Sequence, residues 1–354
     1  MAESTKGEAT AVNARTVGAL ALCVVALSGA ATADSAPTVA AAVTPATAAT
    51  AVTAIEASEV AVDNRRADRS LPVPWGSVGH GMAARAAVAV LPASMPAFFR
   101  GADEQFAYLN PEPDRWRDFN SREMDQAFSY DHYIDMENVP AGALDARDRF
   151  TFLRTLYDAG VPQPERDVGF LPFRIVELYQ RLVTEWGLWR REDDPQRRSW
   201  IEQRILNDAG ILGHYVTDGS QPHHTTIHFN GWNGSDAFGT AVQNPEGYTE
   251  DNGFHQRFER SYVEAHLEQI DVSRRVTGAP QSVAGEARGA VLAYLQETFS
   301  NVGELYRLDR DVGFETAAGA QTVRETRDFT ADRLAAGAQM LSVLWWSAWL
   351  ESEG

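Results

Sequence analysis

The segment 204–218 has its apolar residues mostly three or four positions apart, which is the spacing of a helix with one buried face. They are Ile205, Leu206, Ala209, Leu212 and Val216. On such a helix His214 and Asp218 project from the same face, one turn apart. Gly219 and Pro222 predict that the helix ends there and that the chain reverses. The sequence therefore presents two polar side chains at the end of a half-buried helix.

Two such side chains can hold one metal ion, or they can cap and solvate a helix end. The pair alone leaves both interpretations open. His223 and His224 follow the turn directly. They are close enough in sequence to serve a second ion beside the first.

The remaining histidines favour the metal interpretation. All eight histidines of the chain lie at or after position 80. His255 and Glu259 form another pair four residues apart, and chance seldom gives two such pairs. His80 and His132 are further candidates, although a histidine like His80, taken by itself, is more often structural. Asp114 joins them as a candidate ligand, and its alternative is a helix N-cap.

Composition restricts the kind of site. The chain has one cysteine, Cys23, which lies in an apolar N-terminal run, so residues after it offer no thiol ligand and no disulfide. A metal must then be held by His, Asp and Glu, a donor set suited to zinc in a hydrolytic site. The net charge of −18 does not favour polyanionic partners.

The N-terminal residues predict export. Lys6 and Arg15 precede the apolar run 16–30, and an Ala-x-Ala site ends at Ala33. This is typical of a secretory signal peptide over residues 1–33, and the run is too short to span a bilayer. Residues 34–74 are rich in Ala, Thr and Val without periodicity, which predicts a low-complexity linker or pro-segment. We expect a secreted, extracellular or periplasmic protein with no transmembrane anchor.

Residues 75–354 predict one all-α domain of several helices that project ligands inward. No alternating run or hairpin signal indicates a strand. The expected helices cover residues 81–91 with His80 in the first turn, 153–156, 175–189, 204–218, 254–264, 284–306 and 329–350. Segments 111–117 and 129–135 are expected to be loops or short helices, and 225–252 a long irregular loop near the site.

These motifs together resemble the zinc-dependent phospholipase C and S1/P1 nuclease superfamily, over residues 75 to the end. Three features carry the resemblance: Trp75 followed closely by Gly-His80, the run His-x-x-x-Asp-x-x-x-Pro-x-His ending at His224, and the later His255-x-x-x-Glu259 pair. The resemblance implies a compact all-α fold of that type.

The resemblance also implies a ligand set for two or three Zn²⁺ ions. One ion is held by Asp114, His132, His214 and Asp218. A second is held by His224, His255 and Glu259. A third is held by His80, Asp218 and the free amino group and carbonyl of Trp75.

The implied chemistry is hydrolysis of a phosphodiester by a zinc-activated water, with Asp114 orienting or deprotonating that water. Glu259 and the lack of thiols resemble the phospholipase branch, so we expect a monomeric enzyme that acts on phospholipid at a membrane surface. Two alternatives stay open. One is a single-strand nuclease of the S1/P1 type, which would bind nucleic acid through aromatic side chains. The other is a non-enzymatic helical domain stabilised by metal.

Overall fold

Helices provide the regular secondary structure of the computed structural model, which describes residues 75–118, 120–316 and 323–354. No strand is found in these ranges, and two isolated bridges lie in the loop between η4 and α11. The predicted fold class, all-α, is confirmed.

The first half of the fold consists mainly of short helices. They are α2 (Gly76–Ala89), α3 (Ala97–Arg100), α4 (Asp103–Leu109), α5 (Glu112–Arg115), α6 (Arg122–Phe128), η1 (Ser129–His132), η2 (Met136–Asn138), η3 (Ala143–Asp145), α7 (Arg149–Asp158) and α8 (Pro164–Asp167). The second half contains the long ones. They are α9 (Leu171–Arg191), α10 (Pro195–Asp218), η4 (Pro222–Thr225), α11 (Phe254–Gln256), η5 (Arg257–Tyr262), α12 (Val263–His266), α13 (Gln269–Ser273), α14 (Ala287–Ser300), α15 (Val302–Asp311) and α16 (Arg324–Glu351).

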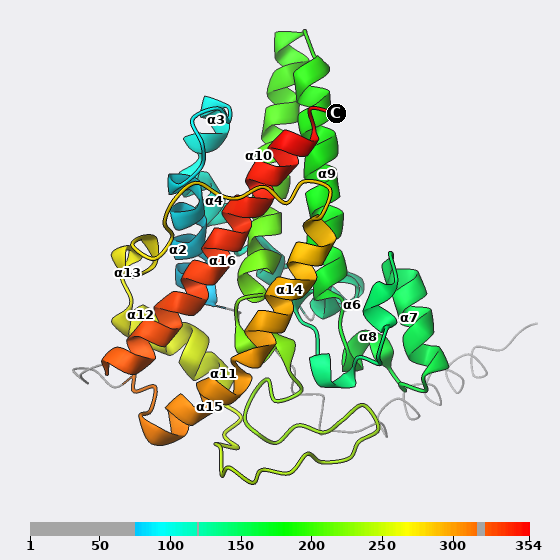
Figure 1. Ribbon diagram of the computed structural model, residues 1–354, viewed down its shortest axis with the longest axis vertical. Coiled ribbons are helices and arrows are strands. Elements are labelled where there is room, and N and C mark those ends of the chain that lie inside the picture. Colours follow the sequence, from blue (N-terminus) through cyan, green and yellow to red (C-terminus); the bar gives the residue numbers. More distant parts are fainter. Residues whose placement is uncertain (1–74, 119, 317–322) are drawn as a thin grey trace, which may run out of the picture. The chain divides into compact units, whose positions relative to one another are not determined.

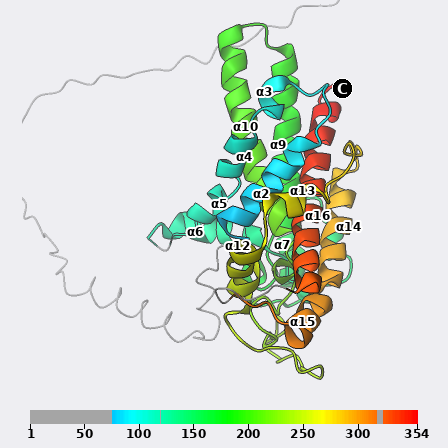
Figure 2. The same ribbon diagram turned by 90° about the vertical axis from the view of Figure 1, so that its left-hand side faces the viewer.

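Helix α10 is the central element of the fold. It begins with Asp194 as N-cap, whose carboxylate accepts a hydrogen bond from the backbone N–H of Arg197 at 2.9 Å, and with Pro195 in the first turn. It packs against α9, α16 and α4. Within the described part of residues 75–354, the turn between α9 and α10 lies at one end of the helical domain, and the loop between η4 and α11 lies at the other (Figures 1 and 2). The C-terminal end of α10 therefore points toward the loop.

Two glycines of α10 allow α4 to approach it closely. A Cβ atom at Gly210 would lie 2.5 Å from Leu109 Cβ, and one at Gly213 would lie 2.8 Å from Asn110 Nδ2. Helix α16 also packs closely here: Trp345 donates its indole N–H to the carbonyl oxygen of Ala209 at 3.2 Å, and Leu341 Cδ2 would lie 3.2 Å from a Cβ atom at Gly213. Close packing by both helices fixes α10 and places the α4–α5 segment beside its last two turns.

Several predicted boundaries needed correction. Helix α2 begins at Gly76, not at residue 81, so His80 lies in its second turn. The predicted helix 284–306 is two helices, α14 and α15, that meet at Asn301. Asn301 donates its side-chain amide to the carbonyl of Glu297 at 2.8 Å, a local bond that competes with continued helix. The segment 254–264 is helical but includes the π-helical turn η5.

The other predicted elements are confirmed. Segments 153–156, 175–189, 204–218 and 329–350 fall within α7, α9, α10 and α16, and segments 111–117 and 129–135 contain short helices. The expected signal peptide and pro-segment, residues 1–74, lie outside the described residues. Across the part of the chain that is described, no helix combines the length and the apolar character needed to cross a membrane.

Candidate metal centre

The fold brings the predicted ligands together from separate elements. Helix α2 contributes His80, α5 contributes Asp114 and η1 contributes His132, whereas the other five residues come from α10, η4, α11 and η5. Their side chains form three groups, and within each group the ligand atoms lie within 4.8 Å of one another. The groups are His80, His214 and Asp218; Asp114, His132 and His214; and His224, His255 and Glu259. Of the predicted ligands only Trp75 is outside these groups.

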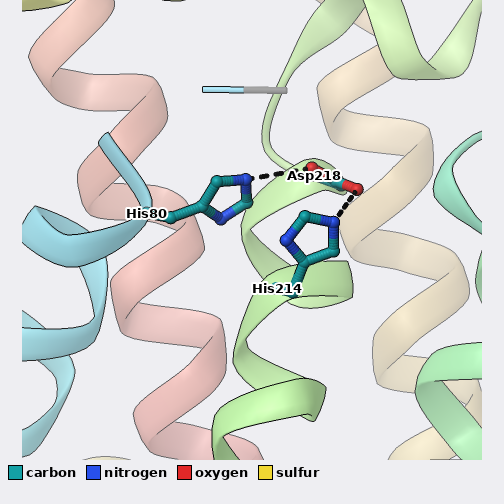
Figure 3. A group of neighbouring side chains, drawn as sticks. All are labelled: His80, His214 and Asp218. Carbon is teal, nitrogen blue, oxygen red and sulfur yellow. Dashed lines mark ion pairs between the residues drawn. The ribbon is translucent and has the colours of Figure 1, made fainter. Parts of the chain in front are cut away.

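Asp218, the last residue of α10, faces four histidines; one of them is His224, whose Nδ1 is 3.8 Å from Asp218 Oδ2. Its Oδ2 atom is 2.9 Å from His132 Nδ1 and 3.2 Å from His214 Nε2. Its Oδ1 atom is 3.5 Å from His80 Nε2, on the other side of the carboxylate (Figure 3). The two oxygens of Asp218 therefore contact different histidines.

Asp114 completes a group with His132 and His214. Its Oδ1 atom is 3.9 Å from His132 Nδ1 and 3.7 Å from His214 Nε2, and these two nitrogens are 2.9 Å apart. Because His214 belongs to this group and to the one with His80, its ring links the two. The structure brings Asp114 together with His132 and His214; the predicted ion site that adds Asp218 to them stays a prediction.

The third group lies where η4 meets the π-helical turn. Glu259 Oε2 is 2.7 Å from His255 Nε2 and 3.7 Å from His224 Nε2, and these two nitrogens are 3.3 Å apart. Gln221 donates its amide N–H to the same oxygen at 3.0 Å. Glu259 lies in the π-helical turn η5, and such turns are frequent at functional sites.

Hydrogen bonds to the far side of three rings fix their orientation. His80 Nδ1 is 2.8 Å from Asn110 Oδ1, His224 Nδ1 is 2.8 Å from the carbonyl oxygen of His132, and His255 Nδ1 is 2.8 Å from that of Phe229. An oxygen of this kind can only accept, so the proton is on Nδ1 and the Nε2 lone pair faces the group. Metal-binding histidines in proteins are commonly held in this way.

Burial also sets the protonation states. It lowers the pKa of His132, of His224 and of His214, the last to about 4, so these rings are neutral near pH 7. Burial, and then the charge of Asp218, raise the pKa of Asp114 well above its usual range. Burial opposes ionisation of Asp218 too, but His214, His224 and His132 outweigh it and hold the pKa of Asp218 well below that range.

These residues fit a zinc site. His80 Nε2, Asp218 Oδ1, Glu259 Oε1 and both oxygens of Asp114 are buried and have no hydrogen-bond partner among the described residues. Leaving such atoms unpaired is costly, and cations bound at the three groups would satisfy them. Neutral imidazoles are the form that binds metal, and a bound cation would favour ionisation of the Asp114 carboxyl as well. Nitrogen and oxygen donors without sulfur suit Zn²⁺.

Trp75 lies next to the groups without contributing a side-chain ligand. Its indole ring is fully buried, its Nε1–H donates to the carbonyl oxygen of Thr217 at 3.0 Å, and its ring centre is 5.4 Å from that of Phe258. It has a φ of 38°, in the left-handed region, alone among the non-glycine residues that the structure describes. The predicted use of its amino group and carbonyl stays a prediction.

A small cavity of about 50 Å³ opens beside the groups and is lined by His132, His224 and His255. Arg117, one turn after Asp114, lines it too. Its guanidinium Nη1 is 3.8 Å from Asp114 Oδ1, and its Nε is buried without a hydrogen-bond partner in the described structure. Arg117 was not among the residues predicted from the sequence, where its position three residues after Asp114 was the available signal. Asn110 and Gln221 were not predicted either, and the sequence carried no signal for them.

Comparisons with known proteins add little to this geometry. No family model matches the chain. A curated protein of Bradyrhizobium tropiciagri named a probable serine protease is 24% identical over 209 residues, which cover 52% of this chain and 24% of that protein. The crystal structure of alpha-toxin from an avian strain of Clostridium perfringens is similar with a TM-score of 0.32 and 12% identity, over 80% of this chain and 66% of that one. The chain therefore spans less than two thirds of the length of either protein.

Proposed function

We propose that this protein is a zinc-dependent hydrolase that cleaves phospholipids at the phosphodiester bond, as a phospholipase C does. The observation that carries the proposal is the set of three adjacent groups of His, Asp and Glu, linked through His214 and Asp218. A metal that only stabilises a fold needs one closed site. Several linked groups beside a cavity are typical of hydrolytic centres that act on phosphoesters.

The distances between these residues support the assignment of ligands that the resemblance implies. Asp114, His132, His214 and Asp218 would hold one zinc, and His224, His255 and Glu259 a second. His80 and Oδ1 of Asp218 would hold a third zinc, together with the amino nitrogen and carbonyl of Trp75. Zinc bound there would lower the pKa of a water toward neutrality and neutralise charge on the phosphoryl oxygens.

The chain's own residues would orient the reaction. Both oxygens of Asp114 lack hydrogen-bond partners within the described ranges, so one oxygen can bind an ion while the other accepts a hydrogen from the attacking water. Arg117 lines the cavity beside the groups, and its guanidinium can donate to a phosphoryl oxygen as negative charge develops. Buried rings around it exclude bulk water and strengthen both interactions.

A phospholipid substrate is favoured over nucleic acid for two reasons. Glu259 occupies the last ligand position, as in the phospholipase branch that the sequence resembles. The net charge of −18 opposes the approach of a polyanion. Nuclease activity of the S1/P1 type is the alternative that the same centre could support.

One set of assays tests the proposal. Purified protein is offered a phospholipid, a sphingophospholipid, single-stranded DNA and RNA, with and without chelator. We expect lipid cleavage that chelator abolishes and zinc restores. Replacing His214 or His224 by alanine should remove activity and lower zinc content, whereas His266→Ala, outside the groups, should change neither.

Two results would overturn it. Full activity in demetallated protein would remove zinc from the mechanism. Faster cleavage of single-stranded DNA than of any lipid would put the enzyme in the nuclease branch.

The third ion requires a processed chain. A peptide nitrogen after Pro74 has no lone pair to donate, so Trp75 can bind through its nitrogen only if the chain begins there. Signal peptidase cleavage after Ala33 would leave residues 34–74 in place, and a second cleavage would follow export. N-terminal sequencing of the active form together with a zinc count tests this. A fully active protein that begins at Asp34 would exclude the Trp75 chelate.

A further inference from the structure

The turn 228–231, in the loop between η4 and α11, holds His255 at two points. The carbonyl oxygen of Phe229 is 2.8 Å from His255 Nδ1, and Asn230 Oδ1 accepts the backbone N–H of His255 at 3.1 Å. The opposite nitrogen of the ring, Nε2, faces Glu259 Oε2 and His224 Nε2. The position of this turn therefore decides where the His255 ring points.

One side chain of α15, that of Tyr306, holds the turn 228–231. The hydroxyl of Tyr306 donates to the carbonyl oxygen of His228 at 2.5 Å and accepts from the backbone N–H of Gly231 at 3.0 Å. These two bonds join both ends of the turn. Tyr306 is fully buried, and its burial raises the pKa of its hydroxyl well above the usual range, so the hydroxyl stays a donor.

Close packing further restricts the position of the turn and of the Tyr306 ring. Gly231 has a φ of 96°, and a Cβ atom there would lie 2.8 Å from the carbonyl carbon of Glu250. The Tyr306 ring also packs against Trp232, with 5.0 Å between ring centres, and against Phe254 at 5.1 Å. Packing fixes the ring of Tyr306, and the ring fixes its hydroxyl.

We propose that Tyr306 is a positioning residue for the group of His224, His255 and Glu259: its hydroxyl holds the turn 228–231, and the turn holds the His255 ring with Nε2 toward an ion. The inference rests on the proposed function, because it assumes that this group binds zinc. Residues that orient metal-binding histidines typically contribute 10- to 100-fold to metal affinity. Tyr306 acts through the backbone of the turn, so the lower end of that range, about 10-fold, is expected.

Tyr306→Phe is the direct test, because it removes the hydroxyl and keeps the ring contacts. Zinc affinity of each ion is measured by competition with chelators of graded strength, and the Co²⁺-substituted protein is compared by its absorption spectrum. We expect the ion of the His224 group to bind about 10-fold more weakly and its cobalt bands to shift. Binding at the Asp114 group should be unchanged.

Tyr179→Phe is the matched control. It also removes a buried hydroxyl, one that donates to Glu351 at 2.6 Å, on α9 away from the three groups. Asn230→Ala provides a second route, since it detaches the same turn from the backbone of His255 and should give the same selective loss.

The outcomes are distinct. Unchanged affinity in Tyr306→Phe, or an equal loss in Tyr179→Phe, would overturn the positioning role while the proposed function stands. Wild-type protein with no zinc bound to His224, His255 and Glu259 would overturn the proposed function and this inference together. Measured unfolding of the metal-free variants shows that each is folded.

Discussion

Replacing Asn110 by leucine removes the acceptor that holds the His80 ring, at nearly constant side-chain volume. Asn110 is 1% exposed, its Oδ1 is 2.8 Å from His80 Nδ1, and its Nδ2 has no hydrogen-bond partner in the described structure. The substitution therefore removes one side-chain hydrogen bond. The free energy of unfolding should fall by about 0.5–1.5 kcal/mol, the net value of such a bond.

The loss in metal affinity should be larger than the loss in stability. Without an acceptor at Nδ1, neutral His80 can move its proton to Nε2, which lies 3.5 Å from Asp218 Oδ1. That shift restores part of the lost free energy of unfolding, but it places a proton on Nε2, whose lone pair an ion needs. We expect zinc held by His80 and Asp218 to bind about 10- to 100-fold more weakly, which corresponds to roughly 1.4–2.7 kcal/mol.

The assay combines urea unfolding of the metal-free protein with chelator competition. Asn138→Leu is the control: Asn138 is also buried, and its amide bonds the backbone of Asp167 and Ala237, each at 2.8 Å. It should lose stability and keep wild-type zinc affinity. If Asn110→Leu binds every ion as the wild type does, the orienting role of Asn110 is wrong.

Three further predictions follow from packing, charge and the cavity. Gly213→Ala would place a Cβ atom 2.8 Å from Asn110 Nδ2. We expect the free energy of unfolding to fall by up to about 2 kcal/mol, which is the cost of overpacking minus the gain in helix propensity. We also expect weaker zinc binding. Burial, with Asp208 beside it, raises the pKa of Glu185 to about 8. The folded protein then keeps a proton that the unfolded chain releases near the ordinary pKa of a glutamate, 4.5. Stability should fall as pH rises between these values, and Glu185→Gln should abolish that fall in urea titrations. Arg117→Met should lower kcat about 100-fold with unchanged zinc content.

Each of these has a clear contrary result. A Gly213→Ala protein as stable as the wild type would mean that α4 can move aside. Parallel pH profiles for wild type and Glu185→Gln would mean that Glu185 does not hold its proton. Unchanged kcat in Arg117→Met would remove that side chain from the transition state.

The sequence by itself determined the helical class and most of the ligand groups. Periodic apolar residues fixed α10, and residues four apart on a helix, such as His214 with Asp218, must share a face whatever surrounds them. The pair His255 and Glu259 came from the same rule, although a π turn joins them. His80 and Asp114 were placed by resemblance to a known superfamily, since nothing local relates them to α10.

Only the tertiary structure decided what orients the ligands. Asn110 reaches His80 because Gly213 lets α4 lie close to α10, and two of the acceptors are backbone carbonyls, which every residue has and no sequence pattern marks. Tyr306 is fifty-one positions from His255 and acts through a turn. The residues that orient each ligand depend on which segments of the chain meet there. Packing over the whole domain decides which segments meet, and the sequence near each ligand does not.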